Sequence, residues 1–86
     1  MEDFIGRTTP QATDLEQVIL GAILIDKEAI LEASEILTAD MFYDDRHQHI
    51  YKTISAMFAR HEPIDVLTVH SELEKLNLLD QVGGAY

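Results

Sequence analysis

Apolar residues recur along most of this chain at the three- and four-residue spacing of an α-helix. The first such stretch runs from about residue 13 to residue 25. Its stripe consists of Leu15, Val18, Ile19, Ala22 and Ile23. Leu20, Leu24 and Ile25 widen the stripe, so the pattern predicts a mostly buried helix.

The start of this helix is predicted from its polar residues. Thr13 and Glu16 have the spacing of a capping box, in which each side chain binds a free backbone N–H at the helix start. Gly21 lies inside the helix, where a glycine costs about 1 kcal/mol relative to alanine. We expect the close approach of another helix at Gly21 to compensate for this cost.

Two further helices are predicted on either side of the middle of the chain. Asp26 can cap a helix over residues 27–37, whose buried face is expected to consist of Ile30, Ala33, Ile36 and Leu37. Asp65 can cap a helix over residues 66–76, and Asn77 after it suits a left-handed C-terminal residue. Short connections therefore separate these helices from their neighbours.

The helix with the cleanest period lies between those two, over residues 46–60. Asp44 and Asp45 precede it, and Asp45 and Gln48 have capping-box spacing. Just before these acids, Thr38 can cap a short turn. The apolar face of the helix consists of His47, Ile50, Tyr51, Ile54, Met57 and Phe58.

These patterns define the fold class and the organisation of the chain. No stretch alternates with a period of two, so the sequence predicts an all-α fold, a compact bundle of four main helices plus short turns. Residues 1–12 are interpreted as a flexible N-terminal lead-in and residues 13–86 as one helical domain. The side chains expected to hold the structure together are Leu15, Ile19, Ile23, Ile50, Ile54, Phe58 and Leu73.

Charge and composition narrow the class of function. The 86 residues include 6 basic and 16 acidic ones, a formal net charge of −10. Phosphate backbones repel such a chain, so we expect no direct nucleic acid binding by this segment. The absence of cysteine excludes disulfides and thiolate metal sites. No apolar run is long enough to span a bilayer, and we expect a soluble, cytoplasmic protein.

Candidate metal ligands are few. His47 and His49 lie two residues apart near Asp44 and Asp45, but positions i and i+2 point to different faces of a helix. Asp40, Asp44 and Asp45 lack the glycine and the closing glutamate of a calcium loop. We therefore expect no metal site.

Candidate catalytic and nucleotide-binding residues are also few. No serine or other nucleophile stands beside His70 in a recognised motif, and a phosphate-binding loop motif is absent. We therefore expect no catalytic and no cofactor-binding residue in this segment.

Several short stretches occur together in a recognisable order. They are Pro10-Gln11, Glu16-Gln17-x-Ile19-Leu20-Gly21, Phe42-Tyr43, His47-Gln48-x-Ile50-Tyr51, Pro63-Ile64-Asp65, x-Leu67-Thr68-Val69, Glu72-Leu73 and Leu79-Asp80-x-Val82-Gly83-Gly84. No single stretch is specific, but the ordered set, over residues 10–86, resembles the N-terminal domain of the bacterial replicative DNA helicase, the DnaB type.

The resemblance implies a role that spacing alone does not indicate. Such helicases are hexamers that unwind DNA with an ATP-dependent C-terminal motor. Their N-terminal domains form a collar that recruits primase through the C-terminal domain of primase. This chain resembles the globular head of that domain, without the helical hairpin and without the motor that binds ATP and Mg²⁺. Collar dimerisation in the family uses the hairpin, so we expect the head alone to be monomeric or only weakly associated.

The leading hypothesis is therefore a protein-docking head whose partners are primase and a helicase loader. Asp14, Glu28 and Glu32 are the candidate partner-binding residues, because the helical period exposes them and no cap needs them. One alternative assigns the head to hexamer assembly alone. A second, from another class, is a small metal-dependent enzyme that uses His47, His49 and the neighbouring acids.

Overall fold

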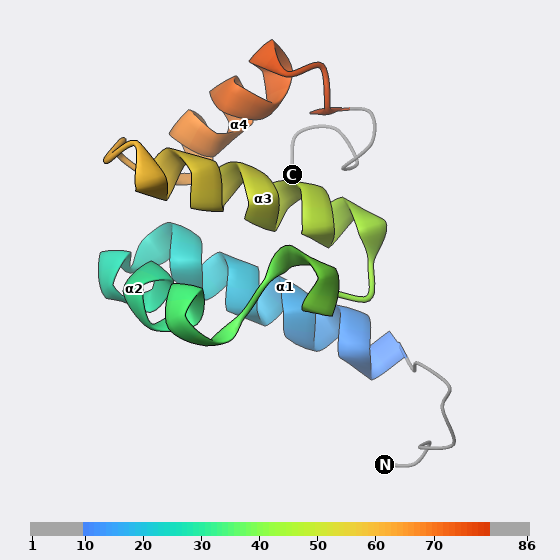
Figure 1. Cartoon of the computed structure of the whole chain (residues 1–86). Helices are drawn as coiled ribbons and strands as arrows, with labels where there is room; N and C mark the ends of the chain where they lie inside the picture. The colour runs from blue at the N-terminus through green and yellow to red at the C-terminus, as the bar shows by residue number, and fades with distance from the viewer. Residues whose placement is uncertain (1–9, 80–86) are drawn as a thin grey trace.

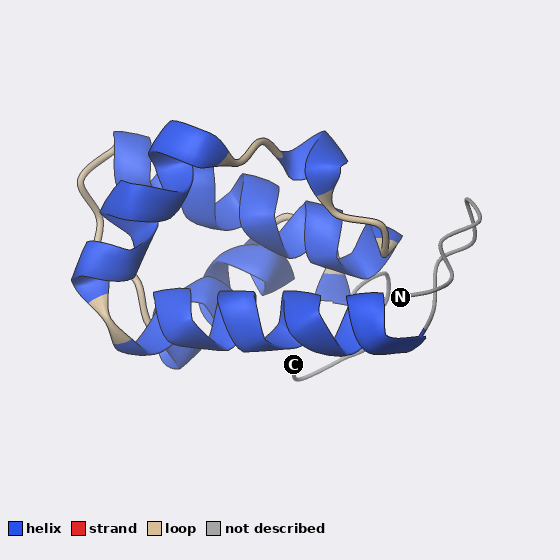
Figure 2. Cartoon of the chain, turned by 90° about the horizontal axis from the view of Figure 1, so that it is seen from below, coloured by secondary structure: helices blue, strands red, loops and turns tan. Residues whose placement is uncertain are grey.

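The computed structural model describes residues 10–79, which form four α-helices and one short 3-10 helix. They are α1 (Pro10–Ile25), α2 (Lys27–Ile36), η1 (Ala39–Met41), α3 (Asp45–Ala59) and α4 (Val66–Lys75). Short loops join these helices, and the structure contains no strand within residues 10–79 (Figure 2). The predicted all-α fold is therefore confirmed. None of these helices is long and apolar enough to cross a membrane.

Helix α3 is the centre of the arrangement. It lies between α4 on one side and α1 with α2 on the other (Figure 1). Its buried face supplies Ile50, Tyr51, Ile54 and Met57 to the core. The remaining buried apolar residues come from every other α-helix and from the loop after η1, and they are Leu20, Ile23, Ile30, Phe42, Val69 and Leu73.

Helix α1 begins earlier than its capping pattern predicted. Its first residue is Pro10, whose fixed φ angle and missing N–H suit the first helical position. Thr13 therefore lies inside the helix, and the predicted capping box of Thr13 and Glu16 is wrong. Residues 10–12 of the predicted lead-in belong to α1, while residues 1–9 lie outside the described part of the chain, and the flexibility of the lead-in stays a prediction.

Glu16 has a different role, because it ties α1 to the start of α3. Its carboxylate accepts hydrogen bonds from the backbone N–H groups of Tyr43 and Asp44. It also lies 2.7 Å from Nδ1 of His47, a contact between two buried side chains. Since a carboxylate can only accept, Nδ1 of His47 carries the proton in this contact. Glu16 thus satisfies backbone groups of the segment that leads into α3.

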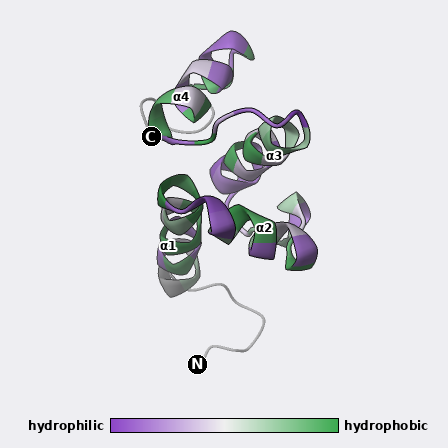
Figure 3. Cartoon of the chain, turned by 90° about the vertical axis from the view of Figure 1, so that its left-hand side faces the viewer, coloured by the Kyte–Doolittle hydropathy of each residue, from purple (hydrophilic) through white to green (hydrophobic). Residues whose placement is uncertain are grey.

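The outer face of α1 is more exposed than its sequence pattern predicted. The residues Leu15, Val18 and Ile25 are 60%, 66% and 87% exposed, and Ala22 is exposed too. The prediction that Leu15 belongs to the core is therefore wrong. The prediction of a close helix at Gly21 is also wrong, since a Cβ atom there would have no described neighbour within 4 Å. Much of α1 is coloured as hydrophobic in Figure 3, so periodicity alone does not identify its buried side.

The caps of the other three α-helices follow the sequence with one correction. Asp26 accepts a hydrogen bond from the N–H of Glu28, and Asp65 forms a capping box with Thr68. At α3 the cap is Asp44 rather than Asp45, because the Asp44 side chain accepts from the N–H of Arg46. The predicted box of Asp45 and Gln48 is therefore wrong, and the side-chain amide of Gln48 instead donates to the carbonyl of Phe42.

The other predicted turn residues have the expected positions. Thr38 is the N-cap residue of η1, although its hydroxyl bonds to Asp40 and not to the helix backbone. Asn77 has a left-handed φ of 60°, as predicted after α4. His61 has a φ of 61° as well, and the sequence pattern did not single it out.

Candidate protein-docking surface

The three acids predicted to bind a partner are exposed in the structure. Glu28 and Glu32 lie one turn apart on α2, so their carboxylates share a face of that helix. Asp14 lies on α1, roughly 16 Å before its end at a rise of about 1.5 Å per residue. The structure therefore brings two of the acids together and leaves the third apart. None of the three forms an ion pair with another described residue.

The candidate metal ligands do not converge. His47 is buried against Glu16, whereas His49 is half-buried on another side of α3 and its carbonyl accepts from Thr53. Within residues 10–79 no three His, Asp or Glu side chains are grouped as a metal site would need. The geometry of the described residues gives no support to the metal-dependent enzyme.

The acids before α3 have structural partners. Asp44 accepts two hydrogen bonds from the guanidinium of Arg46, at 3.0 and 2.7 Å. Chiefly because of the side-chain hydrogen bond from Arg46, the pKa of Asp44 is lowered to about 2. Asp40 accepts from the hydroxyl of Thr38. These contacts explain both acids as parts of helix starts.

An ion network on the surface joins the end of α3 to α4. Arg60 pairs with Glu62 at 2.9 Å and with Glu72 at 3.1 Å, and Lys75 approaches Glu72 at 3.5 Å. The hydrogen bond from Arg60 lowers the pKa of Glu62, and the same bond raises the pKa of Arg60. Unlike Glu28 and Glu32, Glu62 and Glu72 are already engaged within the domain.

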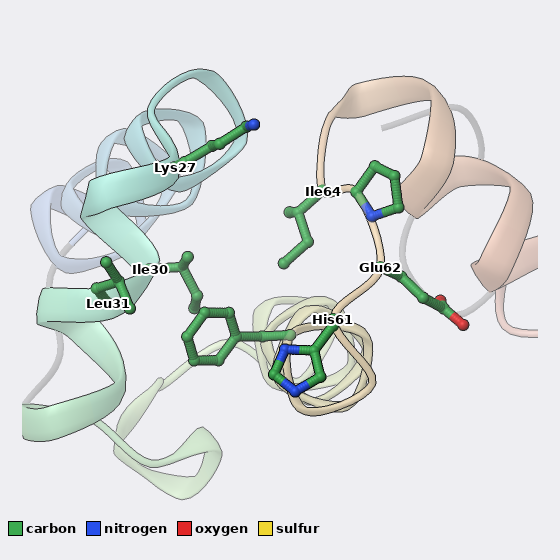
Figure 4. A pocket seen from close by; sticks show the side chains of 8 residues that line it. Lys27, Ile30, Leu31, His61, Glu62 and Ile64 are labelled. Carbon is green, nitrogen blue, oxygen red and sulfur yellow. The ribbon is translucent and has the colours of Figure 1, made fainter.

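A groove between α2 and the α3–α4 loop was missed by the sequence patterns. It has a volume of about 400 Å³ (Figure 4). Apolar side chains make up most of its lining, and they are Ile30, Leu31, Phe58, Pro63 and Ile64. The one available signal in the sequence was the apolar pair Pro63-Ile64 in a loop, where polar residues are more usual.

The described fold and surface define a class of protein. The described residues form an all-helical domain with exposed acids that pair with no other described residue, an exposed apolar helix face and an apolar groove, which together suit contacts with other proteins. A family model described as the DnaB-like helicase N terminal domain matches residues 8–86. The chain belongs to this family, as the resemblance predicted.

Individual relatives agree with the family. The chain is 50% identical over 78 residues to "Replicative DNA helicase DnaB" of Rhodothermus marinus, covering 91% of this chain. It is 45% identical over 85 residues to "Replicative DNA helicase DnaC" of Bacillus subtilis, covering 98% of this chain. These matches span only 8% and 19% of the relatives' own lengths.

A solved structure agrees as well. The crystal structure of the N-terminal domain of DnaB helicase from Mycobacterium tuberculosis superposes with a TM-score of 0.81 at 39% sequence identity. The match covers 90% of this chain and 54% of that one. The predicted architecture of a DnaB N-terminal head is thereby confirmed, and the solved domain extends well beyond the matched part.

Proposed function

We propose that this chain is the docking head of a replicative DNA helicase. In this role it helps to build the collar of a cytoplasmic hexamer and presents acidic side chains to the C-terminal domain of primase or to a helicase loader. Unwinding, with its ATP and Mg²⁺, belongs to a motor outside these 86 residues. The family match over residues 8–86 carries the proposal.

The exposed acids of α2 support a basic partner. Glu28 and Glu32 form no ion pair with a described residue and lie on one helix face. The chain as a whole has a formal net charge of −10, so its field attracts positively charged surfaces and speeds their association. Because exposed charges are screened, such binding weakens at high salt.

Titration with the C-terminal domain of primase tests this surface. We expect the amide signals of residues 14–35 to shift, and the double variant Glu28→Lys/Glu32→Lys to bind about tenfold more weakly, since each exposed charge contributes up to about 1 kcal/mol. The matched control is Glu74→Lys, which reverses an exposed acid on α4. If no amide signal of residues 14–35 shifts, or if Glu74→Lys loses as much affinity as the double variant, the assignment of this docking surface is wrong.

A second candidate function, collar assembly alone, is favoured by the outer face of α1. Leu15, Val18, Ala22 and Ile25 form one exposed apolar stripe, and proteins seldom expose large patches of this kind without a partner. The solved relative's domain is nearly twice as long as the part matched here. We propose that the remaining part of the domain covers the stripe.

Size measurement distinguishes the two functions. This candidate predicts that a chain extended to the full domain length self-associates and that Val18→Asp weakens the association. It also predicts that adding the C-terminal domain of primase leaves every amide signal of the chain unchanged. A shift in residues 14–35 on addition of primase would favour docking instead.

A further inference from the structure

The groove of Figure 4 has an apolar floor built from two separate parts of the chain. Ile30 from α2 is only 3% exposed and lies at its base beside the half-buried Phe58 from α3. Ile64 from the loop points toward them across the groove (Figure 4). A volume of about 400 Å³ falls within the range of sites that bind organic groups in proteins. The groove therefore has room for apolar side chains of a partner.

The lining of the groove includes one lysine and one glutamate, and they point in different directions (Figure 4). Lys27 extends over the groove from the start of α2 and forms no ion pair with any described residue (Figure 4). The one acid of the lining, Glu62, points away and pairs with Arg60. Of the Lys and Glu side chains in the lining, Lys27 is thus the one without an ion pair to a described residue.

Two local features at the groove are unfavourable for the isolated domain. Lys27 is the first residue of α2, where the positive end of the helix dipole disfavours a cation. His61 has a left-handed φ of 61°, a conformation that glycine adopts without strain and other residues adopt at a cost. Both residues line the same groove. The acids Asp26 and Glu28 offset the helix dipole beside Lys27, and the N–H groups of His61 and Glu62 donate to Phe58 and Met57 in the left-handed turn.

We propose that this groove binds a segment of a partner protein that carries an aliphatic side chain next to a carboxylate. The aliphatic side chain lies on Ile30, Phe58 and Ile64, and the carboxylate pairs with the ammonium of Lys27. This site differs from the acidic face of Glu28 and Glu32, which suits a basic partner. The proposal therefore goes beyond the proposed function and does not depend on it.

Two blocked peptides provide a direct test by amide shifts of the 86-residue chain. The first is acetyl-Ala-Leu-Asp-Leu-Ala-amide, and the second has Asn in place of Asp. We expect both to shift residues 27–31 and 58–64, with the Asp peptide binding about two to five times more tightly, as for an exposed ion pair. Lys27→Gln should abolish this difference, whereas Lys52→Gln, which removes another unpaired lysine, should preserve it.

The apolar part of the site is tested with a second pair of variants. Leu31→Ser should weaken both peptides equally, since Leu31 lines the groove at its rim. Ile36→Ser changes an exposed residue of the same helix outside the groove and should leave both affinities unchanged.

Three results would overturn the proposal. The first is the absence of shifts in residues 27–31 and 58–64 at up to about 10 mM peptide, a very weak affinity. The second is equal affinity for the Asp and Asn peptides. The third is a shift of these same amides with protein concentration in the absence of peptide, because a second copy of the chain would then occupy the groove.

Discussion

The two ends of α3 are attached to their neighbours by similar chemistry in different surroundings. At the first end, Glu16 of α1 meets His47 and two backbone N–H groups, and both side chains are buried. At the other end, Arg60 meets Glu62 and Glu72 on the surface, with 45% of the arginine side chain exposed. Water competes for the second set of contacts and hardly for the first. We therefore expect burial, and not the number of contacts, to decide at which end of α3 the polar side chains contribute more to the free energy of unfolding.

The largest expected effect is that of Glu16→Ala at the buried end. The variant removes the carboxylate that accepts from the N–H of Tyr43 and contacts Nδ1 of His47. We expect the free energy of unfolding to fall by about 3 kcal/mol, as for one partner removed from a buried pair. Urea unfolding followed by circular dichroism measures this loss. The control is Gln17→Ala, which changes the neighbouring exposed residue. A loss below about 1 kcal/mol for Glu16→Ala would contradict the proposed difference between the two ends of α3.

A smaller effect is expected at the cap of α3, where Asp44 is partly exposed. Asp44→Ala removes the N-cap and its pairing with Arg46, and we expect a loss of about 1 kcal/mol at neutral pH. The pKa of Asp44 is lowered in the folded state to about 2, chiefly by the hydrogen bond from Arg46. Its contribution is therefore complete above the ordinary pKa of 3.8 and disappears as the pH falls toward 2.

Unfolding curves between pH 6 and pH 2 test this dependence. The difference between the parent chain and Asp44→Ala should shrink over the acidic part of this range. The control Asp14→Ala removes an exposed acid that caps no helix and should change stability little at pH 6. A difference that grows on acidification would show that the carboxylate of Asp44 is not the stabilising form.

His61→Gly tests the turn that follows α3 at the exposed end. Relief of the left-handed conformation of His61 outweighs the added chain entropy of glycine, and we expect a gain of about 0.5 kcal/mol. Asn77→Gly is the matched comparison, because asparagine tolerates this conformation better and should gain less. The proposed groove adds a second readout, since His61 lies away from Lys27 (Figure 4) and His61→Gly should leave the preference for the Asp-containing peptide unchanged.

The smallest effect is expected for Arg60→Gln, which removes the surface network. Exposed ion pairs contribute little, so we expect a loss of about 0.5 kcal/mol or less. High salt screens such pairs, so in about 1 M NaCl the variant and the parent chain should be equally stable. The loss from Glu16→Ala should persist in the same salt. If Arg60→Gln lowered the free energy of unfolding as much as Glu16→Ala does, the proposed difference between the buried and the exposed end of α3 would be wrong.

The predictable part of the fold consists of features that short stretches of chain determine. The caps Asp26 and Asp65 and the left-handed Asn77 are all found where the sequence predicted them. The buried positions of α3 also agree, although Phe58 is only half-buried. Helix α4 buries Val69 and Leu73 but leaves Val66 and Leu76 exposed, and the prediction that Ile36 of α2 is buried is wrong. Of the candidate site, the exposure of Asp14, Glu28 and Glu32 agrees as well, but their role as partner contacts stays a prediction.

The features that the sequence did not predict depend on contacts between residues far apart in the chain. Glu16 has good capping-box spacing with Thr13, yet it binds residues 27 and 31 positions later in the chain. Helix α1 is apolar on most sides, so its period could not show that Leu15 faces outward while Leu20 and Ile23 face α3. The groove joins α2 to a loop, and no local pattern in either stretch indicates the other.

The sequence by itself thus determined the helices, their order, the acidic charge and the family, since each follows from local spacing or from an ordered set of short motifs. Only the tertiary structure decided which side of α1 is buried, what Glu16 binds, and that Lys27 and His61 share one groove. The physical reason is that hydrogen bonds within a helix link residues four positions apart, whereas burial depends on which helices pack together. Packing also decides that the buried contacts of Glu16 at the start of α3 should stabilise the fold more than the exposed ion pairs of Arg60 at its end.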